Sequence, residues 1–221
     1  MKPSVLFFDV NETLLDLSPL KKHIEQALGG NEHLVALWFS TLLHYSLVAN
    51  VTNDYKDFGD IGVGAIMMLA QINGIELTTK DAENAVLIPF KELPAYDDVE
   101  QGLKTLKDKD YLIVALTNSS QKSLEAKLKF AGIYEFFDAV LSAEPVKKFK
   151  PEMAVYHWAM QQVKVKPSDT LMIASHGWDI IGAQKAGMQT CFIERPGKQQ
   201  FPTAPSADLS VTSLIELGSI L

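Results

Sequence analysis

The sequence predicts an α/β fold: a parallel sheet with helices on both faces and a helical insertion after the first strand. Three observations predict it. Five short segments are almost continuously apolar, as strands covered on both faces are. An amphipathic segment, with apolar residues three or four positions apart, precedes each of the last four. The stretch between the first strand and these later segments carries helical patterns only.

The predicted core elements follow one another in a regular order. Strands are expected at 4–9, 111–117, 139–142, 170–174 and 190–194, and helices at 99–109, 120–131, 152–163 and 178–186. Gly132 and Gly187 follow two of these helices, where a C-cap glycine belongs. Alternating strands and helices imply a parallel sheet whose functional site lies at the carboxyl ends of the strands.

Residues 16–96 break this alternation. Their apolar spacing predicts helices at 31–51, 61–72 and 82–90. We therefore expect a core made of residues 1–15 and 97–221, with residues 16–96 as the helical insertion.

The composition excludes several classes of protein. With 221 residues, a formal net charge of −7 and 47% hydrophobic residues, the chain can bury one core and is not disordered. No apolar run approaches the ~20 residues that span a bilayer, and Asp9 comes too early for a secretory leader, so we expect no membrane partner. The acidic balance, without a basic stripe, argues against nucleic acid. Cys191 is the one cysteine, which favours a cytoplasmic location.

Polar side chains follow several of the predicted strands. Asp9 ends the first strand, where a desolvated carboxylate suits a nucleophile, although Asp also caps turns and helices. Thr117 and Asn118 open a helix, which indicates either an anion site or a plain N-cap. For Asp179, in the first turn of a later helix, the plain alternative is interaction with the helix dipole.

Lysines replace arginines almost throughout this chain. Because Arg195 is the one arginine, anion binding must rely mostly on lysines, hydroxyls and backbone N–H groups. Lys150 precedes Pro151, which favours an extended backbone before a helix, and from there it can keep a carboxylate charged. We interpret Lys147 and Lys148 as an ordinary solvated surface.

The order and spacing of four segments resemble the four motifs of the haloacid dehalogenase superfamily over nearly the whole chain. FFDVNETLLD resembles the nucleophile strand, LTNSS the Ser/Thr motif, KFKPE the lysine motif and ASHGWDIIGAQKAGM the acidic loop. The resemblance implies a Rossmann-like core with an inserted helical cap at residues 16–96.

Within that superfamily the chain is most similar to the type II (S)-2-haloacid dehalogenases. Phosphatases carry a second Asp as general acid and a further acid that holds magnesium, but Asn11 and Ser175 stand at these positions. A halide leaving group needs neither a proton nor a metal. Tyr156, six residues after Lys150, and the pair Trp178-Asp179 also match this subfamily. The resemblance implies hydrolysis of short 2-haloalkanoic acids to 2-hydroxy acids, no metal or cofactor, and a possible homodimer.

The resemblance also assigns roles to residues. Asp9 is the expected nucleophile, which forms an ester with the substrate, and Lys150 keeps it ionised. The other expected catalytic residues are Glu12, His176 and Asp179. The expected substrate-binding residues are Val10, Thr13, Phe39, Thr117, Asn118, Tyr156, Ser175 and Trp178.

Three departures from the best-known members change the expected chemistry. Phe39 replaces a cap arginine that helps to bind the halide, and Ala174 replaces a serine. His176 replaces an asparagine and supplies a base with an ordinary pKa near ~6.5. We expect Glu12 to orient His176 and His176 to activate water, as in some marine bacterial members, with Asp179 as the alternative base. A superfamily phosphatase and a non-catalytic binding protein remain the other functional hypotheses.

Overall fold

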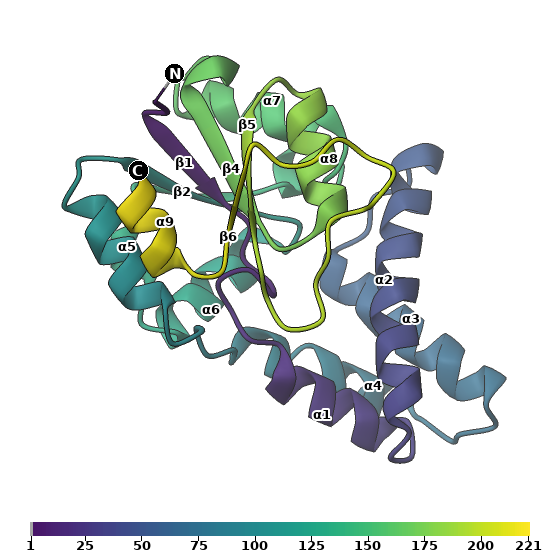
Figure 1. Cartoon of the computed structure of the whole chain (residues 1–221). Helices are drawn as coiled ribbons and strands as arrows, with labels where there is room; N and C mark the ends of the chain where they lie inside the picture. The colour runs from purple at the N-terminus through teal and green to yellow at the C-terminus, as the bar shows by residue number, and fades with distance from the viewer. Residues whose placement is uncertain (1) are drawn as a thin grey trace.

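The computed structural model describes residues 2–221. Over these residues six parallel strands form one sheet in the order β3-β2-β1-β4-β5-β6 (Figure 1). The strands are β1 (Val5–Phe8), β2 (Leu112–Thr117), β3 (Ala139–Ser142), β4 (Thr170–Ala174), β5 (Gln189–Ile193) and β6 (Leu209–Val211). The predicted α/β fold with a parallel sheet is confirmed.

The helices of the described residues fall into two groups. Those of the insertion are α1 (Ser18–Ala27), α2 (Glu32–Thr52), α3 (Phe58–Ile72), α4 (Thr79–Val86) and the 3₁₀ turn η1 (Pro89–Lys91). Those that alternate with strands or follow them are α5 (Val99–Lys107), α6 (Gln121–Phe130), α7 (Met153–Gln162), α8 (Gly177–Lys185) and α9 (Leu214–Ile220), with short turns η2 (Tyr134–Phe136), η3 (Glu144–Val146) and η4 (Pro167–Asp169).

The central strand β1 shows how the two faces of the sheet are covered. Leu6 and Phe8 pack into the apolar cluster that contains the buried side chains of α5, α6 and α9. Val5 and Phe7 point to the opposite face and pack with α7 and α8. Successive side chains of a strand point to opposite faces of the sheet, and helices cover both faces here. All four residues of β1 are therefore apolar.

The register of the sheet brings three strand ends together. Phe8, the last residue of β1, pairs with Ala115 of β2 and with Ile173 of β4. Asp9 continues the ladder by one more hydrogen bond, from its N–H to the Ile173 carbonyl at 3.0 Å. Residues that follow β1, β2 and β4 therefore meet at one edge of the sheet, as expected for a doubly wound fold.

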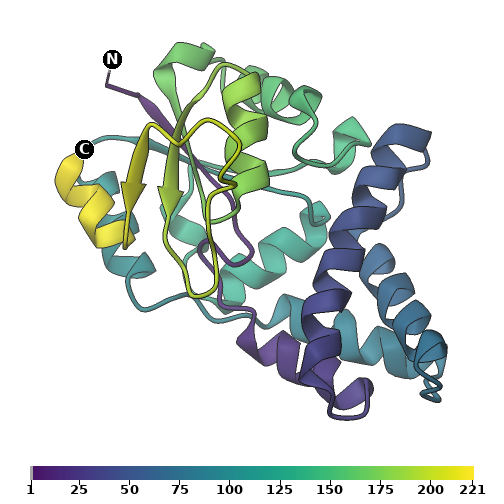
Figure 2. The same ribbon diagram turned by 45° about the vertical axis from the view of Figure 1, so that its right-hand side comes forward.

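The inserted helices form a group of their own beyond the carboxyl ends of the strands (Figure 2). Helix α2 packs along α3, and α1 packs on α4. The fully buried Trp38 of α2 donates its indole N–H to the Gly62 carbonyl of α3 at 2.9 Å. Asn31 caps the start of α2 by accepting from the His33 N–H at 3.1 Å.

Three elements lie outside the predicted set. Helix α1 buries only Leu20 and Ile24, so its apolar pattern is too sparse to predict a helix. Strand β6 and helix α9 are only three and seven residues long. The helix expected at 82–90 is in fact α4, which Thr78 caps by accepting from the Asp81 N–H, followed by η1.

Helix α2 corrects one expectation drawn from composition. It has 21 residues and a mean hydropathy of 1.5, so by length and composition alone it could cross a membrane. Only 28% of that apolar window is buried in the structure. Trp38 and Leu42 pack inside, whereas Leu37, Leu47 and Val51 are exposed. The helix therefore presents an apolar face on the surface of the insertion.

Candidate active site

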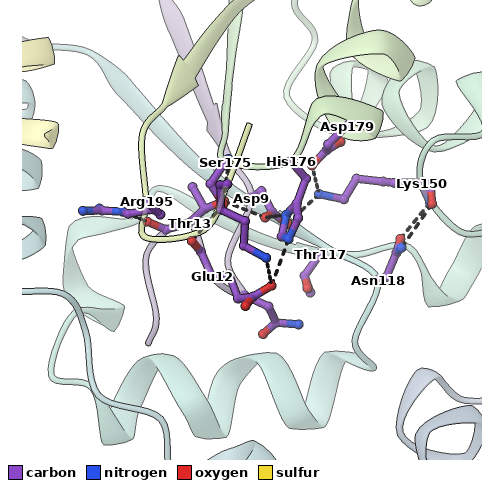
Figure 3. A network of polar contacts seen from close by, with 12 residues as sticks. Asp9, Glu12, Thr13, Thr117, Asn118, Lys150, Ser175, His176, Asp179 and Arg195 are labelled. Atoms are coloured by element: carbon purple, nitrogen blue, oxygen red, sulfur yellow. Dashed lines mark hydrogen bonds and ion pairs between the residues drawn. The ribbon is translucent and has the colours of Figure 1, made fainter. Parts of the chain in front are cut away.

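The site is built around the carboxylate of Asp9, directly after β1 (Figure 3). Asp9 is buried, with 4% of its surface exposed. Its Oδ1 accepts from Lys150 Nζ at 2.9 Å, and its Oδ2 accepts from Thr13 Oγ1 at 2.7 Å. Nδ1 of His176 lies 3.3 Å from the same Oδ2. Side chains from three separate segments thus converge on one carboxylate.

These contacts decide the charge of Asp9. Burial alone raises the pKa of a carboxyl group. At Asp9 the charge of Lys150 and the hydrogen bond from His176 outweigh burial, so the pKa of Asp9 lies well below its usual range. The carboxylate is ionised, has little water around it, and can therefore act as a nucleophile.

Lys150 is the cation that joins the two buried acids of the site. Besides Asp9, its Nζ donates to Asp179 Oδ2 at 2.7 Å and to the Leu116 carbonyl at 2.9 Å. Burial lowers the pKa of an amine, but the two carboxylates raise the pKa of Lys150 above its ordinary value. Asn118 fixes the Lys150 backbone by accepting from its N–H at 2.7 Å and donating to its carbonyl at 3.2 Å.

Both carboxylate oxygens of Asp179 accept hydrogen bonds from buried side chains. Its Oδ1 accepts from the Tyr156 hydroxyl at 2.5 Å, while its Oδ2 accepts from Lys150. Burial raises the pKa of Asp179, and burial next to this carboxylate holds the pKa of Tyr156 well above its usual value. These contacts suit a counter-ion that holds Lys150 in place.

His176 lies between two carboxylates. Its Nε2 is 3.1 Å from Glu12 Oε2, and its Nδ1 faces Asp9. Burial lowers the pKa of an imidazole, but these two hydrogen bonds raise the pKa of His176 above 6.5. Glu12 has a left-handed backbone, with φ at 59°, and also pairs with Lys21 and Lys198. The pKa of Glu12 is lowered because His176 and Lys198 together outweigh its burial.

The loop after β1 is fixed by polar contacts from the core. Ser175 donates its N–H to Thr13 Oγ1 at 3.0 Å and its hydroxyl to the Glu12 carbonyl at 2.8 Å. Arg195 donates from Nε to the Thr13 carbonyl at 3.0 Å and pairs with Asp98 at 2.7 Å. The one arginine of the chain thus holds the loop and does not face the site.

A small cavity opens beside Asp9. Its volume is about 20 Å³, which holds about one water molecule. The ring of Phe39 of α2 stacks with the His176 ring at a centroid distance of 6.1 Å, and the Trp178 ring stacks with it at 5.1 Å. The lining residues are Asp9, Asn11, Phe39, Leu43, Phe58, Thr117, Asn118, Lys150, His176 and Trp178.

Most of the residues singled out from the sequence meet here, although not all reach the cavity. Thr13, Glu12 and Asp179 bind residues that line it. Tyr156 and Ser175 lie one contact further out, since Tyr156 binds Asp179 and Ser175 binds Thr13 and Glu12. The side chain of Val10 instead packs in the apolar core. Three lining residues lay outside the predicted set: Asn11, Leu43 and Phe58. Leu43 follows Phe39 by one helical turn, which is the signal that could have placed it.

Lys148 corrects a second expectation, that of a solvated lysine. Its Nζ donates to the Asn50 carbonyl and to Asn53 Oδ1, both at 2.6 Å, at the end of α2. The Asn50 side chain accepts from the Phe149 N–H and donates to its carbonyl, both at 2.8 Å. These bonds tie the insertion to the loop that carries Lys150.

Among residues 2–221 no group of three His, Cys, Asp or Glu side chains is arranged to hold a metal.

Comparison with known proteins identifies the family. Residues 3–187 match the model of the haloacid dehalogenase-like hydrolases. The chain belongs to this family. It is 31% identical over 216 residues to (S)-2-haloacid dehalogenase 4A of Burkholderia cepacia, which covers 97% of this chain and 93% of the relative. It is 32% identical to (S)-2-haloacid dehalogenase 1 of Pseudomonas sp. strain CBS-3, over 97% of this chain and 94% of the relative.

Solved structures share the whole fold of this haloacid dehalogenase-like hydrolase. A dehalogenase crystallised with an intermediate superimposes with a TM-score of 0.91 at 28% identity, over 100% of this chain and 97% of the other. The L-2-haloacid dehalogenase of Xanthobacter autotrophicus gives the same TM-score at 23% identity, over 99% and 98% of the two chains. This second likeness concerns the fold alone.

We predict that His176 titrates above pH 6.5 in the free protein and that Asp9→Asn lowers its pKa, because the variant removes a negative charge beside the imidazole. NMR titration of ¹⁵N-labelled histidine measures both values. Glu12→Gln is the matched control on the other ring nitrogen and should lower the pKa as well. An Asp9→Asn protein with an unchanged His176 titration contradicts this arrangement.

Proposed function

We propose that the protein is an (S)-2-haloacid dehalogenase, a hydrolase that converts short 2-haloalkanoic acids to 2-hydroxy acids through an ester on Asp9. One observation carries the proposal: the ionised Asp9 carboxylate, bound to Lys150, faces a small cavity with aromatic walls. The curated relatives named above are (S)-2-haloacid dehalogenases, which supports the same reaction. Asn11 and Ser175 argue against a phosphatase, since neither is an acid.

In the first half-reaction Asp9 attacks C2 of the substrate. A C–O bond forms, the C–halogen bond breaks, C2 inverts, and halide leaves with the bonding electron pair. The Thr117 hydroxyl accepts from the Ser119 N–H at 3.3 Å, so its own proton is free for the substrate carboxylate. Phe39 and Trp178 give the leaving halide an apolar surrounding, which favours bromide and iodide because these ions need little charge stabilisation.

In the second half-reaction His176 becomes the base. Ester formation removes the charge of Asp9, so the pKa of His176 falls and its Nδ1 can release a proton to the solvent. Glu12 holds the other nitrogen and fixes the ring. Nδ1 then accepts a proton from water as the water oxygen attacks the ester carbonyl. The bond between Asp9 Cγ and the ester oxygen breaks, and the alkoxide takes the proton of the added hydroxyl group. His176 keeps the proton that it received from water, and the Asp9 carboxylate is restored beside Lys150.

The cap at residues 16–96 belongs to this proposal. A cavity of about 20 Å³ is smaller than a haloalkanoate, so the substrate enters only when the cap residues around Phe39 move. Phe39 also borders an outer cavity of about 430 Å³, which Lys21, Lys22 and Lys198 help to line. We place the enzyme in the cytoplasm, since its one cysteine, Cys191, is a buried free thiol.

We predict that the wild-type protein releases bromide from bromoacetate without added metal and that Asp9→Asn reduces this rate by more than about 10³-fold. The amide has the shape of the carboxylate but is a poor nucleophile. Ion chromatography of released bromide measures the rate, and circular dichroism confirms that the variant folds. Substantial turnover by the variant, after deamidation is excluded by mass, contradicts an ester on Asp9.

We also propose a homodimer formed through the exposed apolar face of α2 and α3. A groove of about 340 Å³ there is lined by Tyr45, Val48 and Met68, and the two helices carry only Glu32 and Asp60 as charged residues. Two charged residues of the loop between the helices, Asp54 and Lys56, also line the groove and pair with each other at 3.0 Å. A second copy offers the same largely apolar face, as a two-fold interface requires. We expect Val51→Glu to halve the mass measured by light scattering, and Ile220→Glu on α9 to leave it unchanged. A wild-type monomer contradicts the dimer.

A further inference from the structure

One buried cation near the site has no role in the mechanism described above. Lys127 of α6 is fully buried. Its Nζ donates to Asn11 Oδ1 at 2.9 Å and to Ser119 Oγ at 3.1 Å, and it lies 3.7 Å from the centre of the Phe90 ring. Neither polar partner carries a charge. Within residues 2–221 no carboxylate lies within 4.0 Å of the Lys127 ammonium.

Each of the other lysines around Asp9 contacts a carboxylate. Lys150 pairs with Asp9 and Asp179. Lys21 and Lys198 pair with Glu12. A buried cation without an anion is costly, because its desolvation is not repaid by a Coulomb interaction. An anion that binds near Lys127 offsets this desolvation cost by its Coulomb attraction, and the charge of Lys127 therefore strengthens binding of the anion.

Asn11 connects Lys127 to the cavity. An ammonium only donates, so the oxygen of the Asn11 amide, and not its nitrogen, must face Lys127. One N–H of that nitrogen donates to Ser119 Oγ at 3.4 Å. The second N–H is available to a ligand, and Asn11 lines the cavity beside Asp9. Lys127 thus both orients this donor and polarises it.

We propose that Lys127 is a positioning residue for the reacting anion: acting through Asn11, it strengthens binding of a small monovalent anion in the Asp9 cavity. The anion is the carboxylate of the substrate or the departing halide, which share this chemistry. The identification of the anion rests on the proposed function. Lys127 supplies positive charge from the core side of a pocket whose cap side carries Phe39.

The proposal makes anion binding dependent on pH. Burial lowers the pKa of Lys127 to about 7, against the opposing effects of Asp9 at the end of β1 and Asp57 at the start of α3. Lys91, the last residue of η1, and Lys122 on α6 are exposed. Raising the pH through about 7 removes the charge of Lys127 and weakens anion binding. An anion that binds nearby raises the pKa again, so binding above this pH takes up a proton.

The test compares wild-type protein with Lys127→Met, which keeps an unbranched side chain of similar length but has no charge. Calorimetric titration with sodium acetate and with sodium bromide gives the affinities from pH 6 to 9. Repeating it at pH 8 in Tris and in Hepes, whose ionisation enthalpies differ and which are too large to compete for the cavity, gives the proton uptake. Lys129→Met, on the exposed side of the same helix, is the matched control. His176 titrates too, but it is present in all three proteins.

We expect Lys127→Met to bind at least one of the two anions about tenfold more weakly at pH 6, with less proton uptake at pH 8, while Lys129→Met behaves as wild type. The anion that is affected identifies the ligand that Lys127 serves. Equal affinity and equal proton uptake in Lys127→Met and wild type overturn the proposal. Halide release by the wild type tests the proposed function separately, because acetate and bromide binding involve no turnover.

Discussion

The buried carboxylate of Asp9 is the constraint on which the rest of the site depends. A negative charge at the end of β1 is tolerable only because Lys150 and His176 contact it directly. Lys150 in turn needs Asp179 and Tyr156 behind it, and His176 needs Glu12. Each group in this chain depends on a hydrogen bond or an ion pair with the next. A change in the charge of Asp9 therefore alters the protonation of its neighbours. In the proposed mechanism, formation of the Asp9 ester in the first half-reaction thereby prepares His176 for the second.

The fold supplies this arrangement through the sheet and the insertion together. Parallel pairing of β1 with β2 and β4 delivers Asp9, Thr117 and the loop with His176 to one edge. The insertion contributes Phe39, Leu43 and Phe58 as the apolar walls opposite that edge. Asn50 and Lys148 bind α2 to the loop of Lys150, so the position of α2 and the placement of the cation depend on each other.

The fold and much of the site could be predicted from the sequence, because the carboxyl ends of parallel strands lie at one edge of the sheet whatever the details of packing. That rule places Asp9, Thr117 and His176 together, and the motifs add Lys150 and Asp179. The same reasoning fails for Lys21, Lys198 and Lys127. They reach the site from a sparsely apolar helix, a loop and the buried side of α6, and no local pattern links them to Glu12 or Asn11. Lys148 is missed for the same reason, since its partners are about a hundred residues away.

In the proposed reaction, an ester on Asp9 is hydrolysed by water that His176 activates. The mass of the protein after incubation with 2-bromopropionate tests it most directly. His176→Ala should release at most one bromide per site and then hold the acyl fragment on the peptide that contains Asp9, since loss of a general base slows a step by ~10²–10⁴-fold. Asp179→Asn should not accumulate this ester. Normal turnover by His176→Ala, together with an ester trapped in Asp179→Asn, would show that Asp179 is the base and contradict the account.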